Sequence, residues 1–218
     1  MGPTPHSKRN ITVDSLVSAW TLLIDKTMLM HIKKCTEIEA RRVLQDEQWP
    51  VDISELKAFL AIVYARGVSH CKNKDVHTIW SENWGIPFCK QTMARNRFSE
   101  IMRFLRFDIK STRRQRLQTL FSEIWNRFID NCQACFKPGP NITIDEQLFP
   151  SKCRCPFTQF MASKPDKYGQ KYWLAVDVDT KYIVNGFPYL GKDGVCPENQ
   201  KVSEYVVLKL VEPIRNSG

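Results

Sequence analysis

The sequence predicts an α+β fold in which a helical half precedes a half built from strands. Apolar residues recur every three to four positions over roughly the first 135 residues, which is the period of helices with one buried face. Pro138-Gly139-Pro140 then interrupts the chain, and Pro/Gly clusters of this kind mark boundaries. The runs that follow are rich in β-branched and aromatic residues, as strands are. Helices followed by strands are typical of the α+β class or of two separate domains.

Six helices are expected before this break. The clearest one follows Asp52, because Glu55 stands three residues later with the spacing of a capping box, and Gly67 should end it. Asp25 can cap another helix in the same way. A loop is expected at residues 84–87. The expected helices cover residues 16–23, 26–43, 53–66, 75–80, 92–107 and 117–136.

Three strands and one helix are expected after the break. The strand runs are Asn141 to Phe149, Lys171 to Val178 and Tyr182 to Phe187. The last two are separated by a short polar segment at residues 179–181, so they should form a hairpin. A helix from Ser203 to Val211 closes the chain.

Composition excludes a membrane-spanning or secreted protein of the usual kinds. Of the 218 residues, 43% are apolar and 25% are charged, which is ordinary for a globular protein. No stretch approaches the roughly 20 apolar residues that cross a bilayer. The first ten residues lack the apolar core of a secretory signal and are expected to be a disordered tail. The eight cysteines are therefore expected to be reduced thiols in an intracellular protein.

Positive charge is concentrated in one segment, which we call the basic block, residues 90–116. It holds nine basic and two acidic residues, a net charge of +7, whereas the whole chain has +9. Such a block favours a polyanion such as nucleic acid, and Arg pairs well with phosphate; a solvated helix face with a charged loop is the alternative. Arg95, Arg103 and Arg106 fall close together on a helical wheel, beside the apolar stripe. The basic residues are Lys90, Arg95, Arg97, Arg103, Arg106, Lys110, Arg113, Arg114 and Arg116.

Asp145 is the acid that the pattern singles out as a candidate metal ligand. It lies inside the first strand run, where its side chain can project from the sheet toward solvent. Cleavage of phosphodiesters with two metal ions needs several carboxylates, and one Asp cannot hold the pair. An ordinary acid on a strand edge is the alternative. Glu146 should point to the opposite face, because neighbours on a strand alternate.

Two other groups suggest chemistry less strongly. Asp177 and Asp179 resemble an acid pair, but they flank the expected hairpin, where Asp is common for reasons of turn geometry. Four cysteines near the break could form a tetrahedral zinc site, although buried cysteines also act as small hydrophobic residues. These are Cys132, Cys135, Cys153 and Cys155.

Several short motifs together resemble the piggyBac-type transposase family. In the helical half the resemblance is carried by Met93-Ala94-Arg95-Asn96-Arg97-Phe98 and by residues 101–107, Ile-Met-Arg-Phe-Leu-Arg-Phe. In the strand half it is dense. The motifs there are Thr143-Ile144-Asp145-Glu146-Gln147, Arg154-Cys155-Pro156-Phe157, Lys164-Pro165-Asp166-Lys167-Tyr168-Gly169 and Asn185-Gly186-Phe187-Pro188-Tyr189-Leu190-Gly191.

The resemblance implies a helical dimerisation and DNA-binding domain at residues 11–137. At residues 138–218 it implies the first strands of an incomplete RNase H-like nuclease core. Asp145 would be the first of the family's three metal-holding aspartates, with Mg2+ as cofactor. Because the sequence stops at Gly218 without the segments of the other two, we expect a C-terminally truncated relative that binds DNA in the nucleus but does not transpose it, with no functional metal. The candidate DNA contacts are Arg95, Arg97, Arg103, Arg106, Arg113, Arg114, Lys164 and Lys167.

Two alternatives of other classes stay open. The chain could be a non-catalytic interaction module that dimerises through its helical half, with itself or with a full-length transposase. It could also be a fragment of a transposase that folds poorly.

Overall fold

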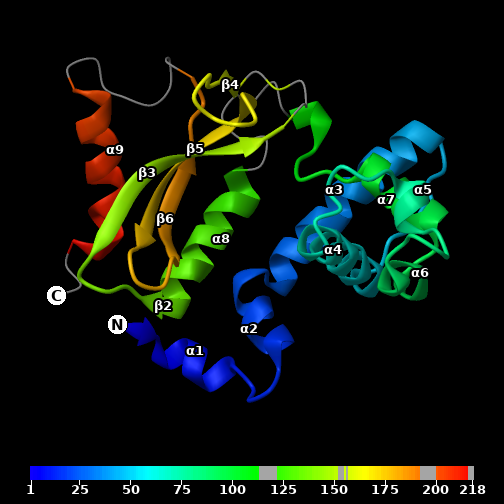
Figure 1. Ribbon diagram of the computed structural model, residues 1–218, viewed down its shortest axis with the longest axis horizontal. Helices are drawn as coiled ribbons and strands as arrows, with labels where there is room; N and C mark the ends of the chain where they lie inside the picture. Colours follow the sequence, from blue (N-terminus) through cyan, green and yellow to red (C-terminus); the bar gives the residue numbers. More distant parts are fainter. Residues whose placement is uncertain (113–121, 152–154, 156, 192–199, 216–218) are drawn as a thin grey trace. The chain divides into compact units, whose positions relative to one another are not determined.

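The computed structural model describes residues 1–112, 122–151, 155, 157–191 and 200–215, and it has the α+β architecture that the sequence predicts (Figure 1). The chain forms two compact units. The first, which we call the sheet unit, combines Met1–Asp25 with Ser122–Gly218. The second, the helical unit, is Lys26–Phe121. No helix among the described residues combines the length and apolar character needed to cross a bilayer.

Within its described residues, 26–112, the helical unit contains five α-helices and a short 3-10 helix, η1. Asp52 caps α4 through a complete capping box with Glu55, as the sequence predicts. The helix runs one residue beyond Gly67. The bounds are α3 (Lys26–Leu44), α4 (Ile53–Val68), α5 (Val76–Ile79), α6 (Pro87–Thr92), α7 (Arg95–Phe104) and η1 (Lys110–Thr112).

Aromatic side chains fill the core of the helical unit. Phe98 on α7 stacks on Phe59 of α4 with ring centroids 5.0 Å apart, and the Trp80 ring is tilted against Phe98 at 4.8 Å between centroids. Trp49 and Phe104 meet edge to face at 5.7 Å. Such pairs contribute about 0.5–1.5 kcal/mol beyond the burial of their area. The apolar stripes at three- and four-residue spacing therefore do face one core.

The sheet unit is organised around its longest strand, β5 (Tyr168–Asp177). All of its pairings are antiparallel: β3 (Ile142–Pro150) lies along one edge, and β4 (Thr158–Phe160) and β6 (Ile183–Pro188) along the other. The expected hairpin between β5 and β6 is confirmed. The short strand β4 was not expected from the sequence.

Helices cover both faces of this sheet (Figure 1). On one face, Val206 and Leu210 of α9 (Val202–Val211) pack against Ala175 in a buried cluster. On the other, the Trp125 ring of α8 (Ser122–Cys135) lies 4.4 Å from Tyr172. A 3-10 helix, η3 (Glu212–Ile214), follows α9.

The first ten residues are ordered, in contrast to the disordered tail that composition suggested. They form β1 (Gly2–Pro3) and α1 (Pro5–Asn10), and β1 pairs with β2 (Phe136–Lys137). The Thr4 and Ser7 hydroxyls donate hydrogen bonds to the carbonyls of Ala134 and Cys135, 2.7 and 2.6 Å long. The segment therefore satisfies carbonyl groups that the end of α8 would otherwise leave without donors.

The boundary expected at Pro138 is not where the compact units divide. Both α8 and α2 (Leu16–Leu23), which we assigned to a helical domain, belong to the sheet unit. The Trp125 indole donates to the Gly186 carbonyl (2.9 Å), and the Tyr182 hydroxyl donates to the Cys132 carbonyl (3.0 Å). These long-range contacts decide the division, and no local sequence pattern records them.

Candidate nucleic-acid interface and the Asp145 strand

Asp145 lies in the middle of β3, directly opposite Leu174 of β5. Its side chain is exposed, and Oδ1 accepts a 2.7 Å hydrogen bond from the Glu146 backbone N–H. Thr143 and Gln147 share its exposed face, because alternate residues of a strand face the same way. The carboxylate is thus presented to solvent, as a metal ligand on this strand would need to be.

Glu146 does not assist Asp145. It faces the other side of the sheet, where its carboxylate pairs with Lys171 at 2.5 Å. The Lys171 ammonium also lies 4.1 Å from the Trp173 ring centroid. The alternation of side chains along the strand predicted this separation.

The described residues bring together no group of three side chains suited to hold a metal ion. Within them, Asp145 offers a single carboxylate. Cys132 and Cys135 are buried on α8, and burial raises the pKa of the Cys132 thiol to about 11. A neutral thiol is a poor metal ligand, so Cys132 behaves as a small hydrophobic side chain. Cys153, from the zinc hypothesis, lies outside the described residues.

Asp177 serves the backbone, as expected for an Asp beside a turn. One carboxylate oxygen accepts from the N–H and the hydroxyl of Thr180, at 2.8 and 2.6 Å, and the other accepts from the Gly139 N–H at 2.7 Å. The bonds from Thr180 and then from Gly139 lower the pKa of Asp177. The buried carboxylate thus ties the Pro138–Pro140 segment to the β5–β6 turn.

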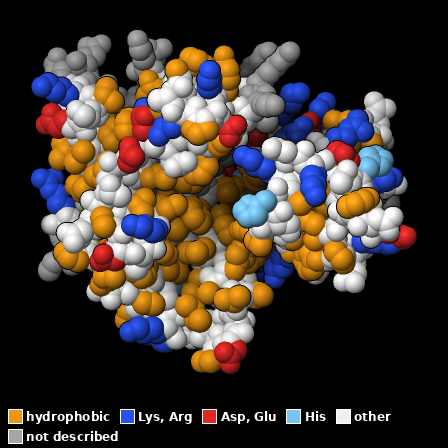
Figure 2. All heavy atoms as spheres, viewed as in Figure 1, with side chains coloured by type: hydrophobic (Ala, Val, Ile, Leu, Met, Phe, Trp, Pro, Cys, Tyr) orange, Lys and Arg blue, Asp and Glu red, His pale blue; other side chains and the backbone are white. Residues whose placement is uncertain are grey.

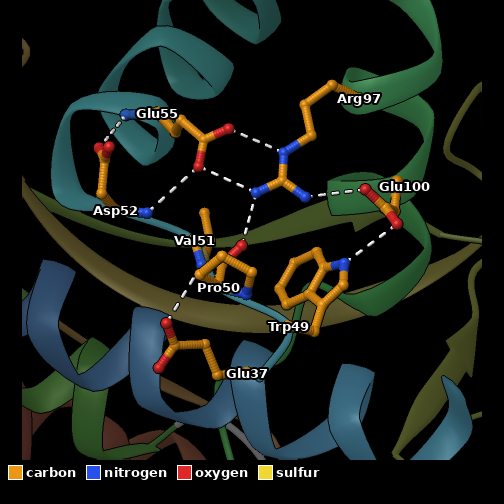
Figure 3. Close-up of polar contacts among 8 residues, drawn as sticks. All are labelled: Glu37, Trp49, Pro50, Val51, Asp52, Glu55, Arg97 and Glu100. Atoms are coloured by element: carbon orange, nitrogen blue, oxygen red, sulfur yellow. Dashed lines mark hydrogen bonds and ion pairs between the residues drawn. The ribbon is translucent and has the colours of Figure 1, made fainter. Parts of the chain in front are cut away.

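Arg97, one of the cations of the basic block, is held by acidic residues of its own unit (Figure 3). Its Nε and one terminal nitrogen donate to the two oxygens of Glu55 at 2.7 and 2.9 Å. The other terminal nitrogen donates to Glu100 at 2.8 Å. The guanidinium carbon also lies 4.7 Å from the Trp49 ring centroid. These contacts give Arg97 a structural role between α4 and α7, and its expected contact with DNA stays a prediction.

Arg106 is likewise drawn inward. The helix α7 ends at Phe104, because Leu105 leaves helical geometry, so Arg106 does not continue the row of Arg95 and Arg103 on the helix. Its guanidinium instead donates to the carboxylate of Glu39 on α3 at 3.0 Å. Glu39 is buried, and a hydrogen bond from Arg42, with further help from Arg106, lowers its pKa.

Other cations of the block present their charge outward. Arg103 is exposed and lies over the Phe104 ring, 5.0 Å from its centroid. Arg95 donates a 2.6 Å hydrogen bond to Nδ1 of His77 and borders a hollow of about 370 Å3 together with Lys90. Lys90 pairs with Glu82 at 2.5 Å, and both side chains are exposed. Arg113 and Arg114 lie outside the described residues.

Lys164 and Lys167 lie in the turn between β4 and β5 of the sheet unit. Lys167 is exposed and Lys164 half-buried, and neither forms an ion pair within the described part of the chain. On the face shown in Figure 2, Lys and Arg side chains are spread over the surface with hydrophobic side chains between them.

The acids that neutralise much of the basic block were not found by counting charge along the sequence. Glu39, Glu55 and Glu82 come from outside the block and pair with Arg106, Arg97 and Lys90. Only Glu55 carried a local signal, its capping-box spacing, and that signal concerns the helix rather than the ion pair. Linear charge density therefore exaggerates the free charge of this segment.

Comparison with known proteins agrees with the motifs. Residues 17–218 match a protein-family profile described as "Transposase IS4". The fold is similar to a chain in a cryo-EM structure of a piggyBac transposase synaptic complex with hairpin DNA, with a TM-score of 0.88 and 30% sequence identity. That match covers 99% of this chain and 46% of the other, so this chain spans less than half of the length of the transposase that it matches. Because the family profile matches nearly all of its residues and its fold is shared with a solved member, the chain belongs to the piggyBac-type transposase family.

Proposed function

We propose that this chain binds DNA through its outward-facing cations and does not by itself carry out transposition. The observation that carries the proposal is that these cations lack acidic partners among the described residues, on a chain whose relative was solved in a complex with DNA. Side chains without an acidic partner can neutralise phosphates without first breaking an ion pair. The cations are Arg95, Arg103, Lys110, Lys164 and Lys167.

Binding of this kind has a characteristic dependence on salt. Each phosphate neutralised releases condensed counterions, so the slope of log K against log salt is about −0.9 per contact. If all five of these cations contact duplex DNA, the slope should be about −4.5. Fluorescence anisotropy of a labelled duplex, titrated with the protein at several salt concentrations, measures it. A binding constant that does not change with salt would refute the proposal.

In this proposal Asp145 contributes a single carboxylate ligand to a metal ion. A carboxylate exposed on β3 suits Mg2+, which prefers hard oxygen ligands. Two-metal cleavage of a phosphodiester requires further carboxylates around it. We therefore propose that Asp145 takes part in metal binding only where other carboxylates, from another segment or another chain, are placed beside it.

Self-association through the helical unit is a second candidate. Val68 at the end of α4 is 80% exposed. A second copy of the chain would bury this apolar side chain. Light scattering after size-exclusion chromatography should then show a dimer that Val68→Arg converts to a monomer, and a monomeric parent protein would rule it out.

A further inference from the structure

Two aromatic rings meet on the surface of the sheet unit at the tip of the β4–β5 hairpin. Phe160 and Tyr168 are directly opposite in the strand register, and their ring centroids lie 5.0 Å apart. Their side chains are nevertheless 57% and 59% exposed. Large apolar rings are usually buried, so an exposed pair of them indicates a surface that another molecule covers.

The turn that joins these two residues is positively charged and ordered. The Met161 N–H donates to the Lys167 carbonyl (2.8 Å), and the Lys164 N–H donates to the Met161 carbonyl (3.1 Å). These backbone hydrogen bonds fix the turn that carries Lys164 and Lys167 between the two rings. Within this turn Lys164 and Lys167 outnumber the one acid, Asp166, and neither lysine forms an ion pair within the described residues. The charge therefore selects an anionic occupant for this surface.

The register places the pair on the same face of the sheet as Asp145. Asp145 is opposite Leu174, and β5 continues from Leu174 through Tyr172 and Gln170 to Tyr168 on one face. Leu174 and Tyr172 are buried on this face, Tyr172 against Trp125 of α8, whereas Tyr168 and the β3 residue Gln147 are exposed. Phe149 lies on this face too, 42% exposed and edge-on to Tyr172 at 5.1 Å. At about 3.4 Å per residue, Tyr168 is roughly 20 Å along the strand from the residue opposite Asp145. A few nucleotides of an extended strand span that distance.

We propose that Phe160 and Tyr168 form a stacking platform for unpaired bases of DNA, with Lys164 and Lys167 on the adjoining phosphates. The proposal rests on the DNA-binding function proposed above and adds to it a preference for unpaired DNA. Exposed aromatic rings flanked by cations are the means by which proteins hold single strands, because every base has a face that can stack. Duplex DNA keeps its bases stacked on one another and cannot use the rings.

The alternative is that the two rings only stabilise their hairpin, since cross-strand aromatic pairs do so. The variant F160L/Y168L separates the two roles because it keeps apolar contact across the strands and removes the aromatic faces. W84L is the matched control: it removes a ring that is 79% exposed in the helical unit. Circular dichroism and the melting temperature establish that each variant is folded.

The experiment compares a labelled oligothymidine strand with a blunt duplex of the same length, at one salt concentration, for the full chain and both variants. We expect F160L/Y168L to bind the single strand about tenfold more weakly per base stacked, with unchanged affinity for the duplex. W84L should bind both DNAs like the parent protein. K164Q/K167Q should weaken binding to both DNAs and flatten the salt slope by about 1.8 for the duplex and about 1.4 for the single strand.

An unchanged affinity of folded F160L/Y168L for the single strand overturns the stacking platform while duplex binding survives. Equal losses for the single strand and the duplex overturn it as well, because they indicate a general contact rather than stacking. Absence of binding to either DNA by the parent protein overturns the DNA-binding function together with it. The two failures are therefore distinguishable.

Discussion

Arg97 and Glu55 form a two-point ion pair between α7 and α4, with Nε–Oε1 and Nη2–Oε2 distances of 2.7 and 2.9 Å. Parallel hydrogen bonds of this kind combine charge with fixed geometry. Glu55 serves two purposes, because the same carboxylate closes the capping box by accepting from the Asp52 N–H at 3.2 Å. One side chain thus starts a helix and attaches it to its neighbour.

We expect Arg97→Met to destabilise the protein by about 2 kcal/mol, because charged hydrogen bonds to Glu55 and Glu100 are lost while the carboxylates stay partly buried. Urea denaturation followed by circular dichroism measures the change. Arg103→Met is the matched control, since that exposed side chain should cost less than about 0.5 kcal/mol. Equal losses in the two variants would contradict the structural role of Arg97.

The free energy of unfolding should decrease in acid, because two carboxylates, Glu55 and Glu39, have lowered pKa values in the folded protein. Hydrogen bonds from Arg97 lower the pKa of Glu55, and Arg42 foremost lowers that of Glu39, below an ordinary value of 4.5. Above pH 4.5 both carboxylates are ionised in the folded and in the unfolded chain, so their full contribution to the free energy of unfolding is present. As pH falls further, the unfolded chain takes up protons first, so the free energy of unfolding decreases through the lowered folded pKa values.

The contribution of Glu55 to this acid effect should disappear when its partner is removed. Free energies of unfolding measured from neutral pH downward should fall less steeply in Arg97→Met than in the parent protein. Parallel curves for the two proteins would show that the ion pair does not hold the pKa of Glu55 down.

Arg95, Arg103 and Arg106 should separate into two classes when each is changed to Gln. Arg95→Gln and Arg103→Gln should each flatten the salt slope of DNA binding by about 0.9, since both side chains face outward. Arg106→Gln should leave the slope unchanged and lower stability, because it leaves the buried Glu39 with fewer donors. A flatter slope in Arg106→Gln would place Arg106 on the DNA instead.

We expect the 218-residue chain alone to leave supercoiled plasmid intact in the presence of Mg2+ or Mn2+. Two metal ions need more carboxylates than Asp145 supplies, and the described residues assemble no group of three ligands. Agarose gel electrophoresis detects nicked and linear products. Nicking by the parent protein that is lost in Asp145→Ala would contradict the expectation.

The segment from Pro138 to Asn141 should resist proteases in the parent protein and become sensitive in Asp177→Ala. The buried Asp177 carboxylate holds the Gly139 N–H, and its loss frees that segment from the β5–β6 turn. Limited proteolysis with mass spectrometry locates the cuts. Rapid cleavage of the parent protein at these residues would show that Asp177 does not restrain them.

Local pattern alone determined much of this protein. The helical period, the capping box at Asp52 and the hairpin between β5 and β6 each depend on residues a few positions apart, so they could be predicted. The outward position of Asp145 and the inward one of Glu146 followed from strand alternation. The family resemblance rested on short motifs that were equally local.

Tertiary structure alone decided which charges are free and which segments belong together. Arg97 and Arg106 lie in the most basic part of the sequence, yet Glu55 and Glu39 reach them from other helices. A hydrogen bond from Trp125 attaches α8 to the sheet, and hydrogen bonds from Thr4 and Ser7 attach the N-terminal segment to the end of α8. An ion pair or a packed ring depends on partners distant in the chain, and residue type and spacing do not specify which partner folding will bring near.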